Sequence, residues 1–208
     1  YNVANMDWDE EMCKVFNLDP ALLGTLQKAE NIVGTIKPEI AEKMGLSPKT
    51  KVIVGTGDEH SACLGSGLVK PGMVCDITGT AEPVAGTSDN PVIDTKGLVE
   101  THHSANSKLW LVENPGFVSG GSTRWYRDTV LQTEEYDLMN VQAARSPIGS
   151  NGVVFLPCMS GAMTPTWNGA ARGTFTGLAL NHTLDDLSRA IFEGITFGLM
   201  DNVKRFEE

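Results

Sequence analysis

The sequence predicts a globular protein in which helices and strands are mixed in α/β or α+β layers. Short apolar runs at 51–54 and 72–78 each lead into a glycine-containing turn, which is typical of strands. Near the C-terminus, apolar residues recur at helical spacing through Leu187, Ile191 and Ile195. Of the 208 residues, 41% are hydrophobic and 20% are charged, which is typical of a chain that folds around a core.

The part of the chain before residue 58 is expected to form five short elements. In order, they are a helix at 5–16, a helix at 20–23, a strand at 32–36, a helix at 38–44 and a strand at 51–54. The first helix begins with acidic residues, which suit the positive end of the helix dipole. The helix at 38–44 is amphipathic and is expected to end before Gly45, because glycine is a typical residue just after a helix.

The rest of the chain is expected to contain further strands and to end in a long helix. The elements are a hairpin of strands at 72–78 and 82–85, two strands within 98–113, a helix that opens at 119–122, a buried strand at 153–157, a loop at 158–173 and a helix at 184–207. A transition between two domains is expected at 70–72, so the chain would divide into residues 1–72 and residues 73–208.

Charge and cysteine content argue against several classes of partner. The formal net charge of −10 repels nucleic-acid phosphates and anionic membranes, so neither is expected as a partner. No apolar run approaches the roughly 20 residues of a membrane span, and no signal peptide is expected. The four cysteines and four histidines lack the spacing of a zinc site. We therefore expect no metal ligands, and reduced thiols in a cytoplasmic protein.

The strongest local motif is Gly-Thr-Gly-Asp at 55–58. A strand that ends in small residues can turn sharply and let a ligand approach. It presents the carboxylate of Asp58 at the strand end, where the binding sites of α/β proteins gather. An aspartate at such a turn is either a catalytic base or a helix N-cap, and on spacing alone the N-cap is the more common of the two.

Two further glycine-containing segments could bind an anion. In the hairpin turn at 78–80, exposed N–H groups and a threonine hydroxyl could contact phosphate oxygens, although an ordinary turn is the simpler explanation. The segment Ser-Gly-Gly-Ser at 119–122 stands at a helix start. There it could either cradle an anion or allow close packing.

Taken in order, these motifs resemble the FGGY carbohydrate kinase family. The resemblance rests on the Gly-x-Gly-Asp turn, the Gly-Thr hairpin and the glycine-headed helix that ends in Arg-Trp. It continues through Phe-Leu-Pro at 155–157, Ala-Arg-Gly at 171–173, Gly-Thr-Phe-Thr-Gly-Leu at 173–178 and Asp-Leu-Ser-Arg-Ala-Ile-Phe-Glu at 186–193. The last two segments and their spacing are the most specific part, and the resemblance spans nearly the whole chain.

The resemblance implies an α/β fold of the ribonuclease H-like, actin-like ATPase class. Residues 1–72 would be the end of a first domain, on the sugar side, and residues 73–208 the start of a second domain, on the ATP side. A phosphate-binding hairpin and sugar contacts would precede the chain, and an adenine-binding segment would follow it. The chain would then be an internal fragment that is inactive alone.

The resemblance also assigns the sugar side of the site. Asp58 would be the catalytic base that deprotonates a sugar hydroxyl, and Asp58 and Glu59 would contact the sugar. Many relatives have Gln or Asn where this chain has Glu59, which bears on the substrate. D-Xylulose, phosphorylated to xylulose 5-phosphate, is the preferred substrate, and ribulose, glycerol or another polyol stay open.

On the nucleotide side, Gly79 and Thr80 would hold ATP phosphates. Gly120 and Arg124 would also contact the nucleotide, although relatives often have Gln at the second position. ATP and Mg²⁺ would be the cofactors. The alternative is an actin-like scaffold or sensor that binds a nucleotide without kinase activity, and a homodimer is left open.

Overall fold

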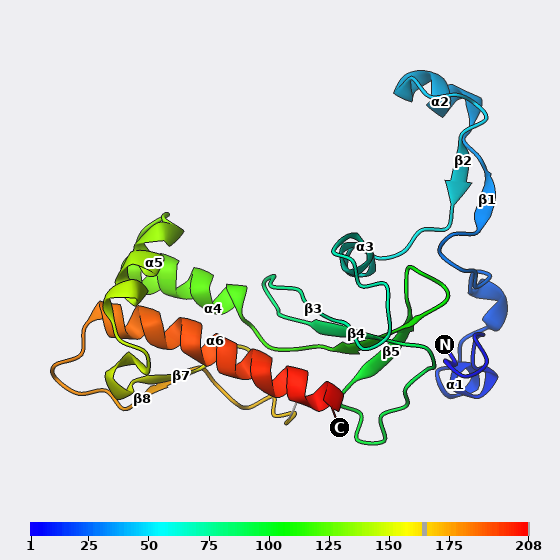
Figure 1. Ribbon diagram of the computed structural model, residues 1–208. Coiled ribbons are helices and arrows are strands. Elements are labelled where there is room, and N and C mark those ends of the chain that lie inside the picture. Colours follow the sequence, from blue (N-terminus) through cyan, green and yellow to red (C-terminus); the bar gives the residue numbers. More distant parts are fainter. Residues whose placement is uncertain (164–165, 208) are drawn as a thin grey trace. The chain divides into compact units, whose positions relative to one another are not determined.

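The computed structural model describes residues 1–163 and 166–207 (Figure 1). The chain forms two compact units. Unit 1 consists of Tyr1–Met73, Gly86–Ile93 and Thr101–Val112. Unit 2 consists of Val74–Ala85, Asp94–Glu100 and the chain from Glu113 onward. Among the described residues, no helix is both long and apolar enough to cross a membrane.

Unit 1 begins with short helices and one strand pair. Its elements are the helix α1 (Glu10–Val15), the 3-10 helix η1 (Pro20–Leu22), the strand β1 (Ile32–Thr35), the helix α2 (Pro38–Met44), the strand β2 (Lys51–Ile53) and the helix α3 (Asp58–Gly65). α2 has the predicted bounds and ends at Gly45, whose φ of 66° is left-handed. The helix predicted at 5–16 begins only at Glu10, because the side chain of Asp9 caps it by accepting a hydrogen bond from the N–H of Met12 (2.9 Å).

β1 and β2 form an antiparallel pair in which Ile32 lies opposite Ile53 and Thr35 opposite Lys51. All residues of both strands are exposed, including Ile32 and Ile53, at 54% and 53% of their surface. Within unit 1 this pair is therefore held by backbone hydrogen bonds and buries little apolar surface.

A four-stranded sheet has the order β3-β4-β6-β5. Its strands are β3 (Val74–Asp76), β4 (Val84–Ser88), β5 (Glu100–His103) and β6 (Trp110–Asn114). The predicted hairpin is confirmed, since β3 and β4 are neighbours and the N–H of Ile77 donates to the carbonyl of Pro83 (3.1 Å) across the turn. The two strands expected within 98–113 are β5 and β6.

Unit 2 contains most of the helical structure. Its further elements are the helix α4 (Gly120–Trp125), the π-helical segment η2 (Tyr126–Leu131), the helix α5 (Tyr136–Arg145), the 3-10 helix η3 (Ser150–Gly152), the strands β7 (Val154–Leu156) and β8 (Thr174–Thr176), and the long helix α6 (Leu184–Glu207). β7 and β8 pair antiparallel, with Phe155 opposite Phe175. Neither α5 nor β8 was predicted. The loop predicted at 158–173 includes residues 164–165, which lie outside the described residues, and its described part closes through a bridge between Ala162 and Asn168.

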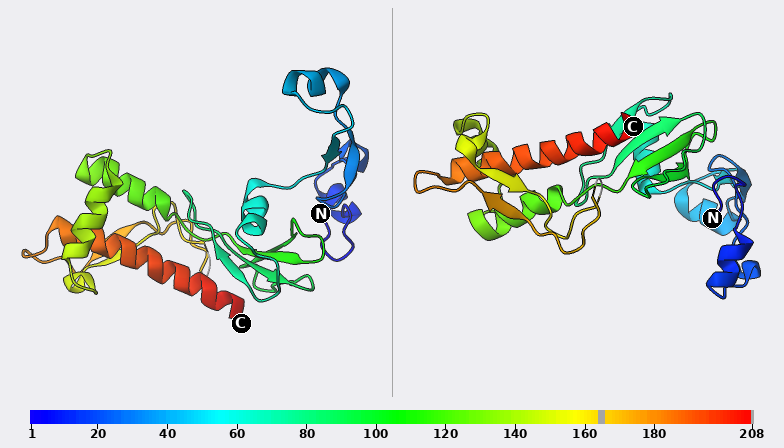
Figure 2. Two further views of the ribbon diagram at one scale, coloured as in Figure 1. Left: turned by 45° about the horizontal axis from the view of Figure 1, so that its top comes forward. Right: turned by 90° about the horizontal axis from the view of Figure 1, so that it is seen from below.

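The core of unit 2 lies where α6 crosses β7 (Figure 2). Its fully buried members are Tyr126, Met139, Val153, Phe155, Ala190 and Ile191. A side chain at Gly194 would lie 2.2 Å from the carbonyl oxygen of Phe155, so glycine lets α6 approach the strand. The predicted buried strand at 153–157 is only half correct, because Phe155 is buried while Val154 and Leu156 are exposed.

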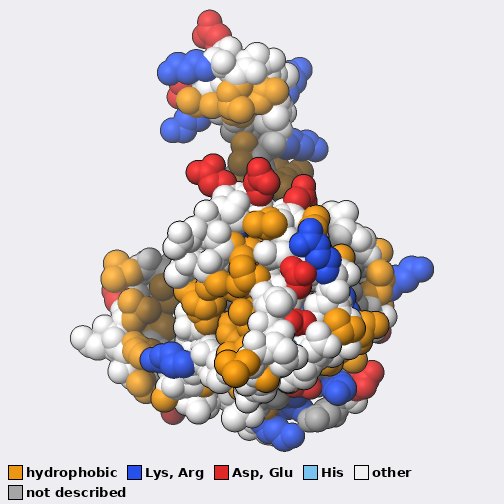
Figure 3. Space-filling model, turned by 90° about the vertical axis from the view of Figure 1, so that its left-hand side faces the viewer, with side chains coloured by type: hydrophobic (Ala, Val, Ile, Leu, Met, Phe, Trp, Pro, Cys, Tyr) orange, Lys and Arg blue, Asp and Glu red, His pale blue; other side chains and the backbone are white. Residues whose placement is uncertain are grey.

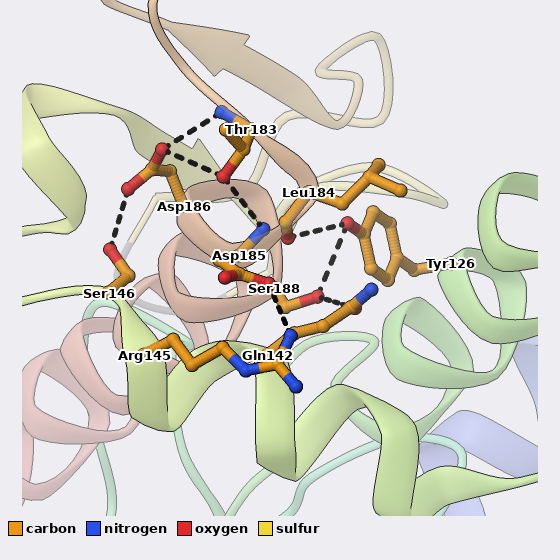
Figure 4. A network of polar contacts seen from close by, with 9 residues as sticks. All are labelled: Tyr126, Gln142, Arg145, Ser146, Thr183, Leu184, Asp185, Asp186 and Ser188. Atoms are coloured by element: carbon orange, nitrogen blue, oxygen red, sulfur yellow. Dashed lines mark hydrogen bonds and ion pairs between the residues drawn. The ribbon is translucent and has the colours of Figure 1, made fainter.

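The start of α6 is held by a capping box (Figure 4). Oγ1 of Thr183 accepts a hydrogen bond from the N–H of Asp185 (3.3 Å), and the carboxylate of Asp186 accepts one from the N–H of Thr183 (2.9 Å). The same carboxylate accepts hydrogen bonds from Oγ of Ser146 (2.7 Å) and Nδ2 of Asn151 (2.8 Å). Asp186 thus ties the helix to the segment that follows α5.

Candidate functional site

The predicted base, Asp58, stands at the first position of α3. The chain leaves β2 and turns at Gly55, whose φ of 78° is left-handed and favours glycine. Gly57 is the N-cap of α3, and Asp58 follows it as an exposed residue. Its Oδ1 accepts a hydrogen bond only from the adjacent N–H of Glu59 (2.9 Å) among the described contacts. The N-cap alternative for Asp58 is therefore wrong, because no side chain caps this helix.

The residues that follow Asp58 lie beside a cluster of rings in unit 1. Glu59 is half-buried, and the ring of His60 lies 5.5 Å from that of His102, measured between centroids. Burial, and then the charge of His102, lower the pKa of His60. The ring of His103 lies 4.1 Å from Trp110. The spacing of these histidines in the sequence gave no sign of this cluster, because it forms only when β5 and α3 come together.

The Gly79–Thr80 turn and the start of α4 lie together in unit 2. The N–H of Gly120 donates to the carbonyl of Gly79 (3.1 Å), and the N–H of Gly121 donates to the carbonyl of Thr80 (3.0 Å). A side chain at Gly120 would lie 2.2 Å from the carbonyl oxygen of Gly79, so only glycine allows this approach. Of the two interpretations of the segment at 119–122, close packing is the one that this geometry favours.

The hydrogen bonds of the turn decide which of its groups face outward. The N–H of Gly79 donates within the turn, to the carbonyls of Ile77 and Ala81 (both 2.9 Å). The N–H of Thr80 donates to no backbone carbonyl of the described chain, and Thr80 is exposed. Arg124 is exposed four residues after Gly120, which places both on one face of α4. Of the residues predicted to contact the nucleotide, Thr80 and Arg124 are exposed, and their contact with an anion stays a prediction.

A buried carboxyl group lies directly behind this turn. Glu82 is only 2% exposed, and its carboxyl faces the carboxylate of Asp76 and the hydroxyl of Ser119. Oε2 of Glu82 and Oγ of Ser119 nevertheless have no hydrogen-bond partner of good geometry within the described chain. Burial first, and then the charge of Asp76, raise the pKa of Glu82 from 4.5 to about 7. Sequence reasoning missed this residue, because nothing local marks a glutamate as buried.

Asp58 and Glu59 belong to unit 1, whereas Gly79, Thr80 and Gly120 belong to unit 2. Within each unit, the predicted site residues just named lie close to one another. That the two groups face one cleft stays a prediction, and so does the domain boundary after residue 72. Within residues 1–163 and 166–207, no three His, Cys, Asp or Glu side chains are placed to hold a metal ion.

A separate groove of about 650 Å³ lies in unit 2 between β7 and α6. Its lining includes Ile148, Phe192 and Phe197 and contains none of the predicted site residues. Ile148 and Phe197 are exposed over 88% and 62% of their surface. Figure 3 shows hydrophobic side chains gathered on one face of the molecule. The groove is lined mainly by apolar groups, together with the ion pair of Arg189 and Glu193 (2.6 Å).

The fold is that of the actin-like, ribonuclease H-like ATPases, as found in solved sugar kinases. The ligand-bound xylulose kinase from Lactobacillus acidophilus superposes with a TM-score of 0.86 at 27% identity, over 99% of this chain and 42% of that chain. The predicted fold class is thereby confirmed.

The sequence comparisons identify the family. The N-terminal domain of the FGGY family of carbohydrate kinases matches residues 1–65, and the C-terminal domain of that family matches residues 76–208. The chain belongs to the FGGY family of carbohydrate kinases, as the motifs in its sequence indicated.

Individual relatives carry different names. The gluconokinase of Bacillus subtilis (strain 168) is 31% identical over 95% of this chain and 40% of its own length. The xylulose kinase of the same organism is 26% identical over 100% of this chain and 42% of its own length. The chain therefore spans about 40% of the length of the relatives that it matches.

Proposed function

We propose that the complete protein transfers the γ-phosphoryl group of ATP to a hydroxyl group of a sugar or polyol. The observation that carries this proposal, beside the family, is the state of Asp58. Its carboxylate is exposed at the start of α3 and is not used to cap that helix. A carboxylate held in this way can accept a proton from a hydroxyl, whereas a nucleotide-binding scaffold has no use for it.

Catalysis would depend mainly on positioning and on electrostatic stabilisation, as in other phosphoryl transfers. Asp58 would accept the hydroxyl proton as the new bond to phosphorus forms. The exposed N–H and hydroxyl of Thr80 would contact phosphate oxygens, and Arg124 would add positive charge on the same side. Mg²⁺ bound to ATP phosphates needs only one or two protein carboxylates and keeps several waters, so the proposal includes no protein cage for it.

D-Xylulose is our first choice of substrate. Glu59 follows Asp58 directly, and two adjacent carboxylates would repel a substrate that carries its own carboxylate. This charge favours a neutral ketose or polyol, such as xylulose, ribulose or glycerol. An aldonate such as gluconate is the second candidate, because a gluconokinase is among the relatives with 31% identity.

The test is an assay of sugar-dependent ADP release by the complete protein. The panel contains D-xylulose, D-ribulose, glycerol and D-gluconate, and saturable turnover is expected with xylulose and not with gluconate. Absence of turnover with every sugar, despite ATP binding, would favour the scaffold. Sedimentation measures the oligomeric state in parallel and tests whether the protein is a homodimer.

A pair of matched variants tests the role of Asp58. Asp58→Asn should lower kcat by roughly 10² to 10⁴, with little change in ATP affinity, if the carboxylate is the base. Asp137→Asn is the control, because Asp137 is also an exposed acid in the first turn of a helix, α5, and has no proposed role. Near-normal kcat in Asp58→Asn would end the assignment of the base.

A further inference from the structure

Glu82 has no place in the mechanism above, yet its side chain is buried directly behind the Gly79–Thr80 turn. It is fully buried at the point where the Gly79–Thr80 turn rejoins β4. Its N–H donates to the carbonyl of Phe117 (2.9 Å), and a side chain at Gly116 would lie 1.7 Å from its carbonyl oxygen. The backbone of Glu82 is therefore held against the segment that leads to α4.

Among the described residues, no positively charged group acts on the Glu82 carboxyl. Asp76, at the end of β3, is the charged group that faces it. On the other side lies the segment 114–123, which contains no titratable residue. An ionised carboxylate here would be buried, unpaired and next to a second negative charge, which is costly. A protonated carboxyl, in contrast, can donate a hydrogen bond to Asp76.

We propose that Glu82 is a positioning residue, which holds the Gly79–Thr80 turn by donating a hydrogen bond from its protonated carboxyl to Asp76. This bond joins the two ends of the turn, because Asp76 ends β3 and Glu82 precedes β4. Loss of the proton would place two like charges across the base of the turn. The carbonyls of Gly79 and Thr80, which accept hydrogen bonds from the start of α4, would then be displaced.

The proposal makes the binding of an anionic ligand at the turn depend on pH. An ionised Glu82 would add negative charge directly behind the exposed N–H of Thr80, which repels a phosphate. By linkage, a bound phosphate would in turn favour the protonated form of Glu82. This pH dependence of ligand binding rests on the proposed function. The protonation of the Glu82 carboxyl and its hydrogen bond to Asp76 do not.

The same proton also affects stability, with a definite sign. The folded state binds it more tightly than the unfolded state, since the pKa of Glu82 rises from 4.5 to about 7 on folding. This contribution to stability is complete below pH 4.5 and is lost as the pH rises through about 7. Glu82→Gln cannot ionise, so the melting temperature of this variant should rise relative to that of the natural protein as the pH increases over this window.

The nucleotide test uses the complete protein and compares it with Glu82→Gln, which keeps the size of the side chain and a neutral hydrogen-bond donor. If only the protonated form binds well, the Kd for ATP should rise about tenfold between pH 6 and pH 8 in the natural protein. In Glu82→Gln, the Kd should stay near the low-pH value throughout. The phosphates of ATP titrate in the same way in both measurements. A difference in pH dependence between the two proteins is therefore due to Glu82. The same pH dependence in both proteins, or ATP binding more than tenfold weaker in Glu82→Gln at pH 6, would overturn the proposal.

A second measurement does not need nucleotide binding. Carbon-13 NMR of the protein labelled in its glutamate carboxyls should show one resonance that titrates near neutral pH and is absent from Glu82→Gln. Asp76→Asn removes the facing charge and should move this titration to lower pH. It also serves as the second variant if Glu82→Gln fails to fold. A Glu82 resonance with an ordinary glutamate titration would refute the proposal even if ATP binds.

The two proposals can fail separately. Suppose that ATP does not bind at any pH but that the Glu82 resonance titrates near 7. The turn would then have no role in phosphate binding, whereas the proposed hydrogen bond from Glu82 to Asp76 would stand. If instead Glu82 and Asp76 together hold a divalent cation, Mg²⁺ without nucleotide would shift the Glu82 resonance. That outcome would also overturn the proposal that Glu82 donates a hydrogen bond to Asp76.

Discussion

Asp186 offers the sharpest test of how α6 is held in unit 2. Its carboxylate accepts four hydrogen bonds, which come from Ser146, Asn151 and both the N–H and the hydroxyl of Thr183. Asp186→Ala would remove all four and leave the hydroxyl of Ser146, which is only 7% exposed, without its acceptor. An unpaired buried donor costs about 1–3 kcal/mol, and loss of a helix cap costs about 1 kcal/mol.

Asn151 and Thr183 are exposed, so their polar groups can turn to water and add little to the loss. The two remaining contributions give an expected total loss of about 2–4 kcal/mol at pH 7. The measurement is urea unfolding of the complete protein, followed by tryptophan fluorescence. Asp185→Asn is the matched control, since Asp185 has a long ion pair with an exposed Arg145 (3.8 Å) and should lose less than about 1 kcal/mol. Equal losses in the two variants would refute the reasoning.

The pH dependence of this loss has a definite sign. The N–H of Thr183, and then the hydroxyl of Ser146, lower the pKa of Asp186 below its ordinary value of 3.8. The stability that its charge contributes is therefore present above pH 3.8 and is lost as the pH falls through the folded-state pKa. The difference between the natural protein and Asp186→Asn should shrink over that range, and a constant difference would contradict the assignment of the charged form.

Three further predictions follow from the packing of unit 2 and from the divided site. Gly120→Ala should push the Gly79–Thr80 turn away from α4 and lower stability by about 1–3 kcal/mol, whereas Gly169→Ala, which meets nothing within 4 Å, should be neutral in the same thermal melt. Ile191→Asp would bury an unpaired carboxylate in the core, so a soluble variant with an unchanged melting temperature would show that α6 is not a core helix. The isolated 208-residue chain should show no sugar-dependent ATP turnover, because it spans about 40% of the length of its relatives and catalysis requires the whole site to hold the reactants in line; saturable turnover by this chain alone would contradict this prediction.

Local patterns predicted much of the secondary structure. α2 was found with its exact bounds, because Gly45 ends it by a purely local conformation. α6 was found because its apolar residues repeat at helical spacing over many turns. The start of α1 was missed by several residues, since the capping hydrogen bond from Asp9 and not the acidic composition decides where that helix begins.

The candidate site was only partly predictable. Asp58, Gly79 and Thr80 stand in turns whose residue types are informative in themselves. The segment 186–193, which carried the most specific part of the family resemblance, has a structural role instead. Beside the hydrogen bonds of Asp186, Ser188 donates to Gln142 (2.8 Å) and Arg189 forms an ion pair with Glu193 (2.6 Å).

The sequence by itself determined the family, many of the elements and the turns that present Asp58 and Thr80, because these depend on residue type and on neighbours in the chain. Only the tertiary structure decided that Gly57 rather than Asp58 caps α3, that Gly120 abuts Gly79, and that Glu82 is buried against Asp76. Contacts of the last two kinds join residues that are distant in the chain or on neighbouring strands. Their energies depend on burial and on the charges that face each other. Neither of these can be predicted from the residue type of a glutamate alone.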